Sequence, residues 1–229
     1  MARSQIIKDI ANSKIDTKTS LKRVKVLLQE LDNTEILDWV NHEIEGYSND
    51  DRLPDYRMVS GEVKGSYLVG SFNKYMSYKN VPIPLGKMPD EWRDYFHHIP
   101  VNMSVDALQQ AISDGKGLEV LIPAEIYPLI AKWNNNPFMN IVTASIELNM
   151  PQITGIMSKI ESRLIDILLV LEKRYGNLDE LDININDKNK DERTAIIKQI
   201  IYIIYNDNSV EIGNNNRIKD TTIASSISE

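Results

Sequence analysis

The sequence predicts an α+β fold: an N-terminal helical bundle, a small antiparallel sheet, a long closing helix, and then a C-terminal helix and a short β tail. Three observations lead to this prediction. Apolar residues recur at helical spacing from Ile6 to Ile44, alternate with polar residues in the middle of the chain, and form one long helical stripe from Ile153 to Leu171. With 229 residues, of which 42% are apolar, the chain is long enough to bury a core.

Three helices open the sequence. The first carries Ile6, Ile7 and Ile10, and Ser20 is placed to cap the second. The third begins at Asn33 or Thr34 and ends before Gly46. The apolar faces of the second and third helices consist of Leu21, Val24, Leu27, Leu28 and Leu31, and of Ile36, Leu37, Val40 and Ile44.

Strands and short helices alternate in the middle of the chain. Val59, Val63, Tyr67 and Val69 share one parity, which indicates a strand, and a second strand follows at 74–79. Short helices are expected at 90–96 and 104–111, and the segment "GLEVLIP" is expected to form a short buried strand. The segment "PAEIYPLIAKW" predicts a helix that its interior proline shortens or kinks, and "NIVTASIELN" predicts an antiparallel strand.

The last third of the chain predicts a long helix and a separate C-terminal segment. The long helix starts near Pro151 and ends at Gly176, and a second helix covers 193–205. The sequence therefore divides into a domain at 1–178, an acidic linker at 179–192, and an oligomerisation or coupling segment at 193–229. In its final residues, isoleucines at uneven spacing favour strand–turn–strand over a stacked β-solenoid rung.

Composition excludes several classes of function. The chain has no cysteine, which excludes disulfides, cysteine zinc sites and thiol nucleophiles and fits a reducing cytoplasm. The N-terminus lacks the apolar run of a signal peptide, and the most apolar run, 195–205, is far shorter than the roughly 20 residues that cross a bilayer. These features predict a cytoplasmic protein with no membrane segment within this chain.

Charge argues against a general nucleic-acid binder. The net charge is −7, whereas phosphate contacts need clustered lysine and arginine. The main basic cluster includes Lys22, Arg23 and Lys25, and a solvated helix face explains it as well as RNA or DNA binding does. The sequence also lacks a glycine-rich phosphate loop and a metal-binding histidine pattern, so we expect no cofactor and no metal.

One stretch raises the question of catalysis, because Asp55, Glu62 and Lys64 resemble the acid, acid-x-lysine pattern of a metal-dependent nuclease. In one unbroken strand the two acids would lie about 23 Å apart and on opposite faces. In a hairpin that turns at Ser60 and Gly61, they would still lie about 13 Å apart. The site therefore needs another acid in place of Asp55, for which Asp50 and Asp51 are the nearest substitutes.

The block "LLQELDNTEILDWVNHEIEGYSNDDRLPDYRMVSGEVKGSY" resembles the AbiTii domain of bacterial abortive-infection proteins, which act in phage defence. The matching residues are Glu35, Trp39, Val40, Glu43, Gly46, Tyr47, Asp50, Asp51, Leu53, Pro54, Tyr56 and Arg57. The resemblance covers about residues 5 to 175, and its closing helix departs from the family pattern in the position of its basic residue, Arg163. It implies a role in defence against phage but no catalytic residue.

The leading hypothesis is a non-enzymatic sensing or assembly module in phage defence, and the alternative is a metal-dependent nuclease or nucleotide hydrolase in the same defence. The expected partners are further copies of the chain and a phage component or an effector, either fused or separate. The final helix is apolar nearly all round and must be covered. The expected interaction residues are Trp39, Tyr47, Tyr56, Arg57, Ile197, Ile200, Ile201 and Ile204.

Overall fold

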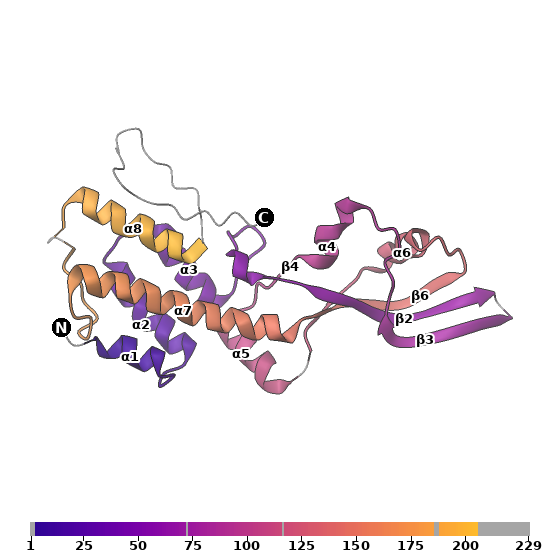
Figure 1. The fold of residues 1–229 in the computed structure, drawn as a ribbon, viewed down its shortest axis with the longest axis horizontal. Helices are drawn as coiled ribbons and strands as arrows, with labels where there is room; N and C mark the ends of the chain where they lie inside the picture. The colour runs from indigo at the N-terminus through magenta and orange to yellow at the C-terminus, as the bar shows by residue number, and fades with distance from the viewer. Residues whose placement is uncertain (1–2, 72, 116, 186–187, 206–229) are drawn as a thin grey trace, which may run out of the picture.

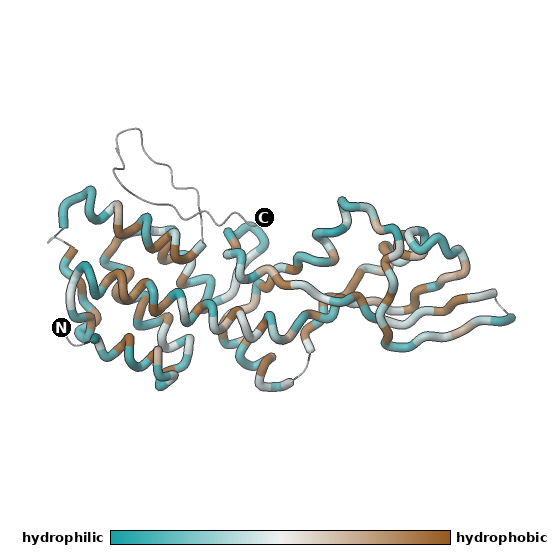
Figure 2. The backbone as a smooth tube through the Cα atoms, viewed as in Figure 1, coloured by the Kyte–Doolittle hydropathy of each residue, from teal (hydrophilic) through white to brown (hydrophobic). Residues whose placement is uncertain are grey.

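The computed structural model describes residues 3–71, 73–115, 117–185 and 188–205, and it confirms the α+β fold. The molecule is elongated, with a body of helices at one end and an arm built on a sheet at the other (Figure 1). Hydrophobic segments run along the inner sides of the body helices and along the strands (Figure 2). Among the described residues, no helix combines the length and apolar character needed to cross a membrane.

The body contains six helices of the described chain, and the longest of them runs along its whole length. These helices are α1 (Gln5–Ala11), α2 (Thr17–Gln29), α3 (Thr34–Glu45), α5 (Val105–Asp114), α7 (Met150–Tyr175) and α8 (Lys190–Tyr205). Asp16, Asn33, Ser104 and Asn149 cap α2, α3, α5 and α7, each accepting a hydrogen bond from a backbone N–H in the first turn.

The arm is a four-stranded antiparallel sheet in the order β3-β2-β6-β5. Its strands are β2 (Gly61–Ser71), β3 (Lys74–Pro82), β5 (Glu119–Leu121) and β6 (Met139–Leu148), and two short helices, α4 (Arg93–His97) and α6 (Tyr127–Trp133), accompany them. A two-stranded sheet joins β1 (Met58–Val59) to β4 (Ile99–Pro100). Three 3₁₀ turns complete the described elements: η1 (Asp55–Arg57), η2 (Asp90–Trp92) and η3 (Ala124–Ile126).

The core of the body forms around α7. Its predicted stripe is confirmed, because Ile153, Ile156, Ile160, Leu164, Ile167, Leu168 and Leu171 are all buried. In the arm, an aromatic cluster holds η2 and α4 against α6. The ring of Trp133 lies 5.5 Å from that of Trp92 and 5.9 Å from that of Phe96. The core continues into the arm through buried aliphatic side chains such as Ile130, Ile141 and Ile146, and the aromatic cluster packs beside them.

Four predicted elements differ in detail from the structure. Helix α2 begins one turn early, at Thr17, because Asp16 rather than Ser20 caps it. Pro128 shortens the predicted helix and does not kink it: α6 begins at Tyr127, the proline stands in its first turn, where it needs no hydrogen-bond partner, and η3 precedes it. Strand β5 is exposed rather than buried because it lies at a sheet edge, and the final helix begins at Lys190.

The segment between α7 and α8 contacts the helical body. Leu178 and Ile183 are buried, and Asp179 accepts a hydrogen bond from the backbone N–H of Gln5 at 2.5 Å. The tail predicted to form strands lies outside the described residues. The division of the chain at 178 and 192 stays a prediction.

Candidate functional site: a buried polar network

Glu43 lies at the centre of a buried network between α3 and η1. It follows Trp39 by one helical turn, so both side chains lie on the buried face of α3. Gly46 ends the helix at φ 100°, a left-handed conformation that favours glycine, and the chain then turns Tyr47 back towards Glu43. Pro54 precedes η1, which places Tyr56 and Arg57 in the interior.

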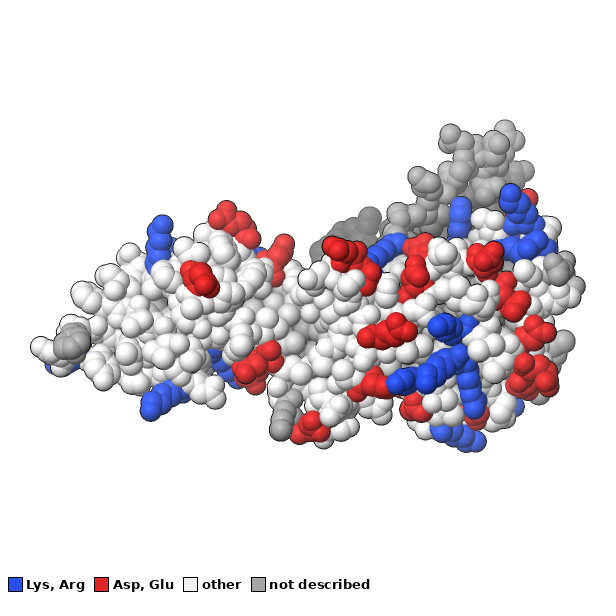
Figure 3. Space-filling view, turned by 180° about the vertical axis from the view of Figure 1, so that it is seen from behind, with Lys and Arg blue, Asp and Glu red and all other residues white. Residues whose placement is uncertain are grey.

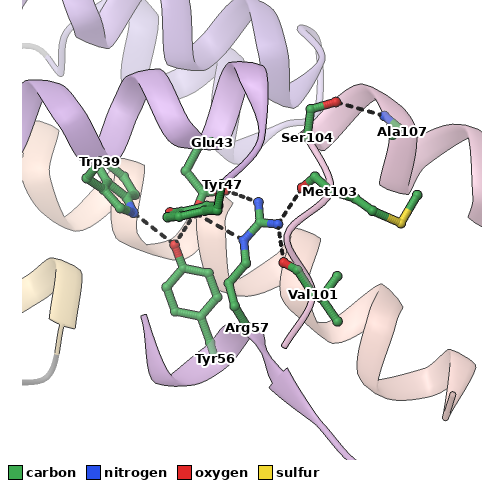
Figure 4. A network of polar contacts seen from close by, with 9 residues as sticks. All are labelled: Trp39, Glu43, Tyr47, Tyr56, Arg57, Val101, Met103, Ser104 and Ala107. Atoms are coloured by element: carbon green, nitrogen blue, oxygen red, sulfur yellow. Dashed lines mark hydrogen bonds and ion pairs between the residues drawn. The ribbon is translucent and has the colours of Figure 1, made fainter. Parts of the chain in front are cut away.

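The carboxylate of Glu43 accepts hydrogen bonds from three side chains (Figure 4). The hydroxyls of Tyr47 and Tyr56 donate to its Oε1 at 2.7 and 2.6 Å. The guanidinium of Arg57 donates Nε to Oε1 at 3.3 Å and Nη2 to Oε2. Trp39 in turn donates its indole N–H to the hydroxyl oxygen of Tyr56 at 2.9 Å.

Arg57 also fixes the chain that enters α5. Its Nη1 donates to the backbone oxygens of Val101 at 3.0 Å and Met103 at 2.5 Å. Backbone hydrogen bonds reinforce this link, because Val101 donates to Arg57 and Tyr47 donates to Asn102. The network therefore joins α3, η1 and the segment before α5 into one unit.

Electrostatics holds the two tyrosines and the arginine of this network in one protonation state near neutral pH. Burial, and then the charge of Glu43, raise the pKa values of Tyr47 and Tyr56 far above the usual 10.0. For Arg57, burial alone would lower the pKa, but the adjacent Glu43 carboxylate outweighs it and the pKa is raised. The tyrosines thus stay neutral and Arg57 stays charged, and none of the three titrates in the range that a general acid or base needs.

Two further arginines lie at the end of α8, and one of them, Arg163, contacts the network. The guanidinium of Arg163 lies 4.2 Å from the ring centre of Tyr56, and its Nε donates to the backbone oxygen of Ile204 at 2.9 Å. The guanidinium of Arg52 lies 3.9 Å from the ring centre of Tyr205. Both arrangements place a cation at a helix C-terminus, where the helix dipole favours positive charge.

The three residues of the nuclease pattern are divided between two elements. Asp55 is exposed on η1, whereas Glu62 and Lys64 lie on β2. The hairpin considered at Ser60 and Gly61 does not form, because β1 pairs with β4 and β2 pairs with β3 and β6. The chain from Met58 to Glu62 is extended instead, over about 13 Å.

The sheet brings a different acid to Lys64. Glu147 of β6 lies directly opposite Glu62, and Lys64 Nζ lies 2.5 Å from Glu147 Oε2 and 3.4 Å from Glu62 Oε2. The hydrogen bond with Glu147 contributes most to raising the pKa of Lys64. Among the described residues, no group of three or more acids or histidines is arranged to hold a metal ion. Asp51 instead accepts hydrogen bonds from Ser48, while Asp50 is exposed.

The remaining predicted residues lie as follows. Trp39, Tyr47, Tyr56 and Arg57 are buried within the chain, as are Ile200 and Ile204, whereas Ile197 and Ile201 are half-buried. In the basic cluster on α2, Arg23 lies 3.8 Å from Asp9. Acidic and basic side chains are mixed over the body surface seen in Figure 3.

Sequence reasoning missed Glu43 and Glu147 as site residues. A signal for Glu43 was available, because it falls on the same face as Ile36 and Val40, where an isolated carboxylate must find a partner. Glu147 carries no such signal, since an exposed glutamate on a strand has no local feature that indicates what lies across the sheet.

Comparison with known proteins agrees with the motif. The family model for AbiTii, a bacterial abortive-infection domain, matches residues 3–197. No curated protein and no solved structure matches the chain. Because the family model covers most of the sequence and includes every residue of the buried network, the chain belongs to the AbiTii family.

Proposed function

We propose that this chain is a non-enzymatic sensing and assembly module that acts in the cytoplasm. The family implies a role in abortive-infection defence. The observation that carries the proposal is the state of the family-like residues: Glu43, Tyr47, Tyr56 and Arg57 are buried and hydrogen-bonded to one another. Residues used in this way hold a fold together and are not available to a substrate.

Helix α8 supplies the surface for assembly. Ile196, Ile200 and Ile204 face α7 and α3, while Ile197 and Ile201 stay half-buried. Tyr202 is 45% exposed on the outer side. A second copy that covers this flank would bury apolar surface left partly exposed in the single chain.

Light scattering on substituted chains tests the assembly. Tyr202→Glu should shift the protein towards the monomer, whereas Val26→Glu, at a 51% exposed position on α2, should not. Point substitutions are preferable to removal of α8, because removal would expose the apolar faces of α3 and α7. A wild-type protein that stays monomeric at high concentration would contradict the proposal.

A second candidate function rests on the position of Glu147. It provides the additional acid that a nuclease needs beside Glu62 and Lys64, although Lys64 is ion-paired to both glutamates. Substitution of Glu62 and Lys64 by alanine tests it in a phage-plating assay, with Lys79→Ala on the neighbouring strand as control. We expect the Glu62 and Lys64 double variant and the Lys79→Ala control to protect fully against phage. If the double variant alone loses protection while its fold stays intact, the result would favour the nuclease.

A further inference from the structure

Strand β6 has an open edge along half of its length. It pairs with β2 from Met139 to Leu148, but β5 pairs with it only at residues 145–147. Among the described residues, no strand lies beside 139–143 on the other side. An open strand presents backbone N–H and C=O groups that can pair with another extended chain.

The two long edges of the sheet differ in how they are protected. Strand β3 carries Lys74, Lys79 and Pro82, residues that hinder pairing with another strand. The open segment of β6 has the sequence Met-Asn-Ile-Val-Thr, which contains neither lysine nor proline and is rich in β-branched residues. Val142 in this segment is 55% exposed, and the adjacent Phe138 is 61% exposed.

A cleft of about 660 Å³ lies along this edge, between β6 and α6. Tyr127 and Ala131 of α6 line one wall, and residues 139–141 line the other. The hydroxyl of Tyr127 accepts a hydrogen bond from the backbone N–H of Ala144 at 3.0 Å, so it takes the place of a neighbouring strand there. The register shift of β6 at Val142 lies between Ala144, whose backbone N–H is hydrogen-bonded, and the open segment 139–141.

The cleft combines apolar side chains with three asparagines, Asn135, Asn136 and Asn140, and has one positive charge. Lys132 is the charged residue of its lining, and no acid belongs to that lining. The rest of the arm surface seen in Figure 3 carries few charges. A fitting ligand is therefore an extended segment with β-branched residues around a single acid.

The chain itself contains such a segment beyond α8: Ser209-Val210-Glu211-Ile212-Gly213. Glu211 cannot reach the cleft of the same chain. Ile204 is held at Arg163, from which about 20 Å of α7 and then about 23 Å of β6 lead to Ile141. These two elements follow one another along the long axis (Figure 1), whereas the chain from Tyr205 to Glu211 spans at most about 21 Å.

We propose that residues 209–213 of a second copy bind in the cleft between α6 and β6, add as a strand at the open edge, and place Glu211 near Lys132. The inference rests on the proposed assembly function and adds a second contact between copies to the one made by α8. Each copy would offer one tail and one cleft, so that association needs no other protein.

Fluorescence polarisation with a labelled peptide of residues 206–216 tests binding to the full-length chain. Loss of the ion pair in Lys132→Glu should weaken binding about tenfold, corresponding to roughly 1.4 kcal/mol. Lys79→Glu, the same charge change on β3, should not weaken it. A peptide with Glu211→Lys should bind poorly to the wild type and regain affinity for Lys132→Glu.

Backbone methylation of the peptide distinguishes strand addition from side-chain binding. Only alternate N–H groups of an added strand face β6. We compare two peptides, one N-methylated at Glu211 and the other N-methylated at both Val210 and Ile212. One of the two should lose binding and the other should keep it. Equal effects of the two patterns, or equal effects of Lys132→Glu and Lys79→Glu, would overturn the proposal.

Association of full-length chains identifies the second copy as the source of the segment. Chains with Lys132→Glu or with Glu211→Lys should each associate less in light scattering, and an equal mixture of the two should recover association. No recovery overturns the inference. If the mixture does not recover association but Tyr202→Glu still reduces it, the proposed assembly function stands without the contact between the tail and the cleft. A wild-type protein that stays monomeric would contradict both the assembly function and this contact.

Discussion

Glu43 and Arg57 are the charged side chains that the described part of the chain buries completely. Each is stable in the interior only because the other is present, since the desolvation of a lone charge costs several kcal/mol. The tyrosine hydroxyls and the backbone oxygens before α5 satisfy the remaining hydrogen-bonding groups. At the scale of the residue, the network is therefore sensitive to the loss of any one member.

Substitution of Arg57 by methionine should lower the free energy of unfolding by about 3–5 kcal/mol, because it leaves the Glu43 carboxyl group buried without its cation. Urea denaturation measures this loss. Arg93→Met breaks an exposed ion pair with Asp90 and should cost less than about 1 kcal/mol. Glu43→Leu combined with Arg57→Met should recover part of the loss, and similar costs for Arg57→Met and Arg93→Met would contradict the role of the network.

The buried tyrosines should make the protein sensitive to alkali. Tyr47 and Tyr56 stay protonated in the folded state, whereas in the unfolded state they ionise above pH 10.0. Their stabilising effect is thus complete below pH 10 and falls as pH rises, by about 1.4 kcal/mol per pH unit for each tyrosine. Unfolding measured from pH 9 to about 11.5 should show little of this slope below pH 10 and should approach about 2.7 kcal/mol per unit for the pair well above pH 10.

Phenylalanine at both positions should remove that part of the slope. Tyr75→Phe, at a 59% exposed position, should leave the slope unchanged. Tyr205, whose pKa burial raises to about 12, accounts for some of the slope that remains. An unchanged slope in the double variant would show that the two hydroxyls ionise freely in the folded state.

At the scale of the element, close backbone approach between β2 and β6 shapes the arm. A Cβ atom on Gly65 would lie 1.9 Å from the backbone oxygen of Thr143, a distance that no side chain can occupy. The position adjoins the register shift between the two strands. Glycine is therefore required where the strands come closest.

Alanine at two glycines should have opposite effects. Gly65→Ala should destabilise the protein by about 1–3 kcal/mol or more, because β2 and β6 must separate. Gly155→Ala, inside α7 with nothing within 4 Å of the added Cβ, should stabilise it by about 0.8–1.0 kcal/mol. Thermal unfolding of both variants measures these changes in stability. If Gly65→Ala is as stable as the wild type, the strands are further apart than described.

At the scale of the whole molecule, the start of the chain is fastened to the end of α7. The carboxylate of Glu172 accepts hydrogen bonds from the backbone N–H and the hydroxyl of Ser4 at 2.6 and 2.7 Å, and it pairs with Arg3. The hydroxyl of Ser4 also accepts a hydrogen bond from the backbone N–H of Leu178 at 3.0 Å. Helix α1 is thus held in place by residues about 170 positions away.

Glu172→Ala should loosen α1 and the chain around Leu178, seen as faster amide hydrogen exchange there and not in the arm. Burial opposes the charge of Glu172, but the hydrogen bonds from Ser4 and the pairing with Arg3 outweigh it and lower its pKa below 4.5. The contact is therefore complete above about pH 4.5 and lost as the pH falls through the lowered pKa. Glu125→Ala, exposed on the arm, should leave exchange in α1 unchanged.

The sequence by itself determined the helices, most of the strands and the family. Helical and alternating patterns are local, so the stripe of α7, the alternation of β6 and the capping asparagine of α3 can be identified from neighbouring residues alone. The AbiTii motif is likewise contiguous, so it can be identified from neighbouring residues.

The tertiary structure alone decided what the motif residues do. Trp39, Glu43 and Arg57 are separated along the chain, and only packing of α3 against η1 shows that they neutralise one another in the interior. It also decided that Lys64 meets Glu147 and not Asp55, and that β6 keeps an open edge beside α6. Pairing between distant segments depends on strand register and helix docking, which no short stretch of sequence encodes.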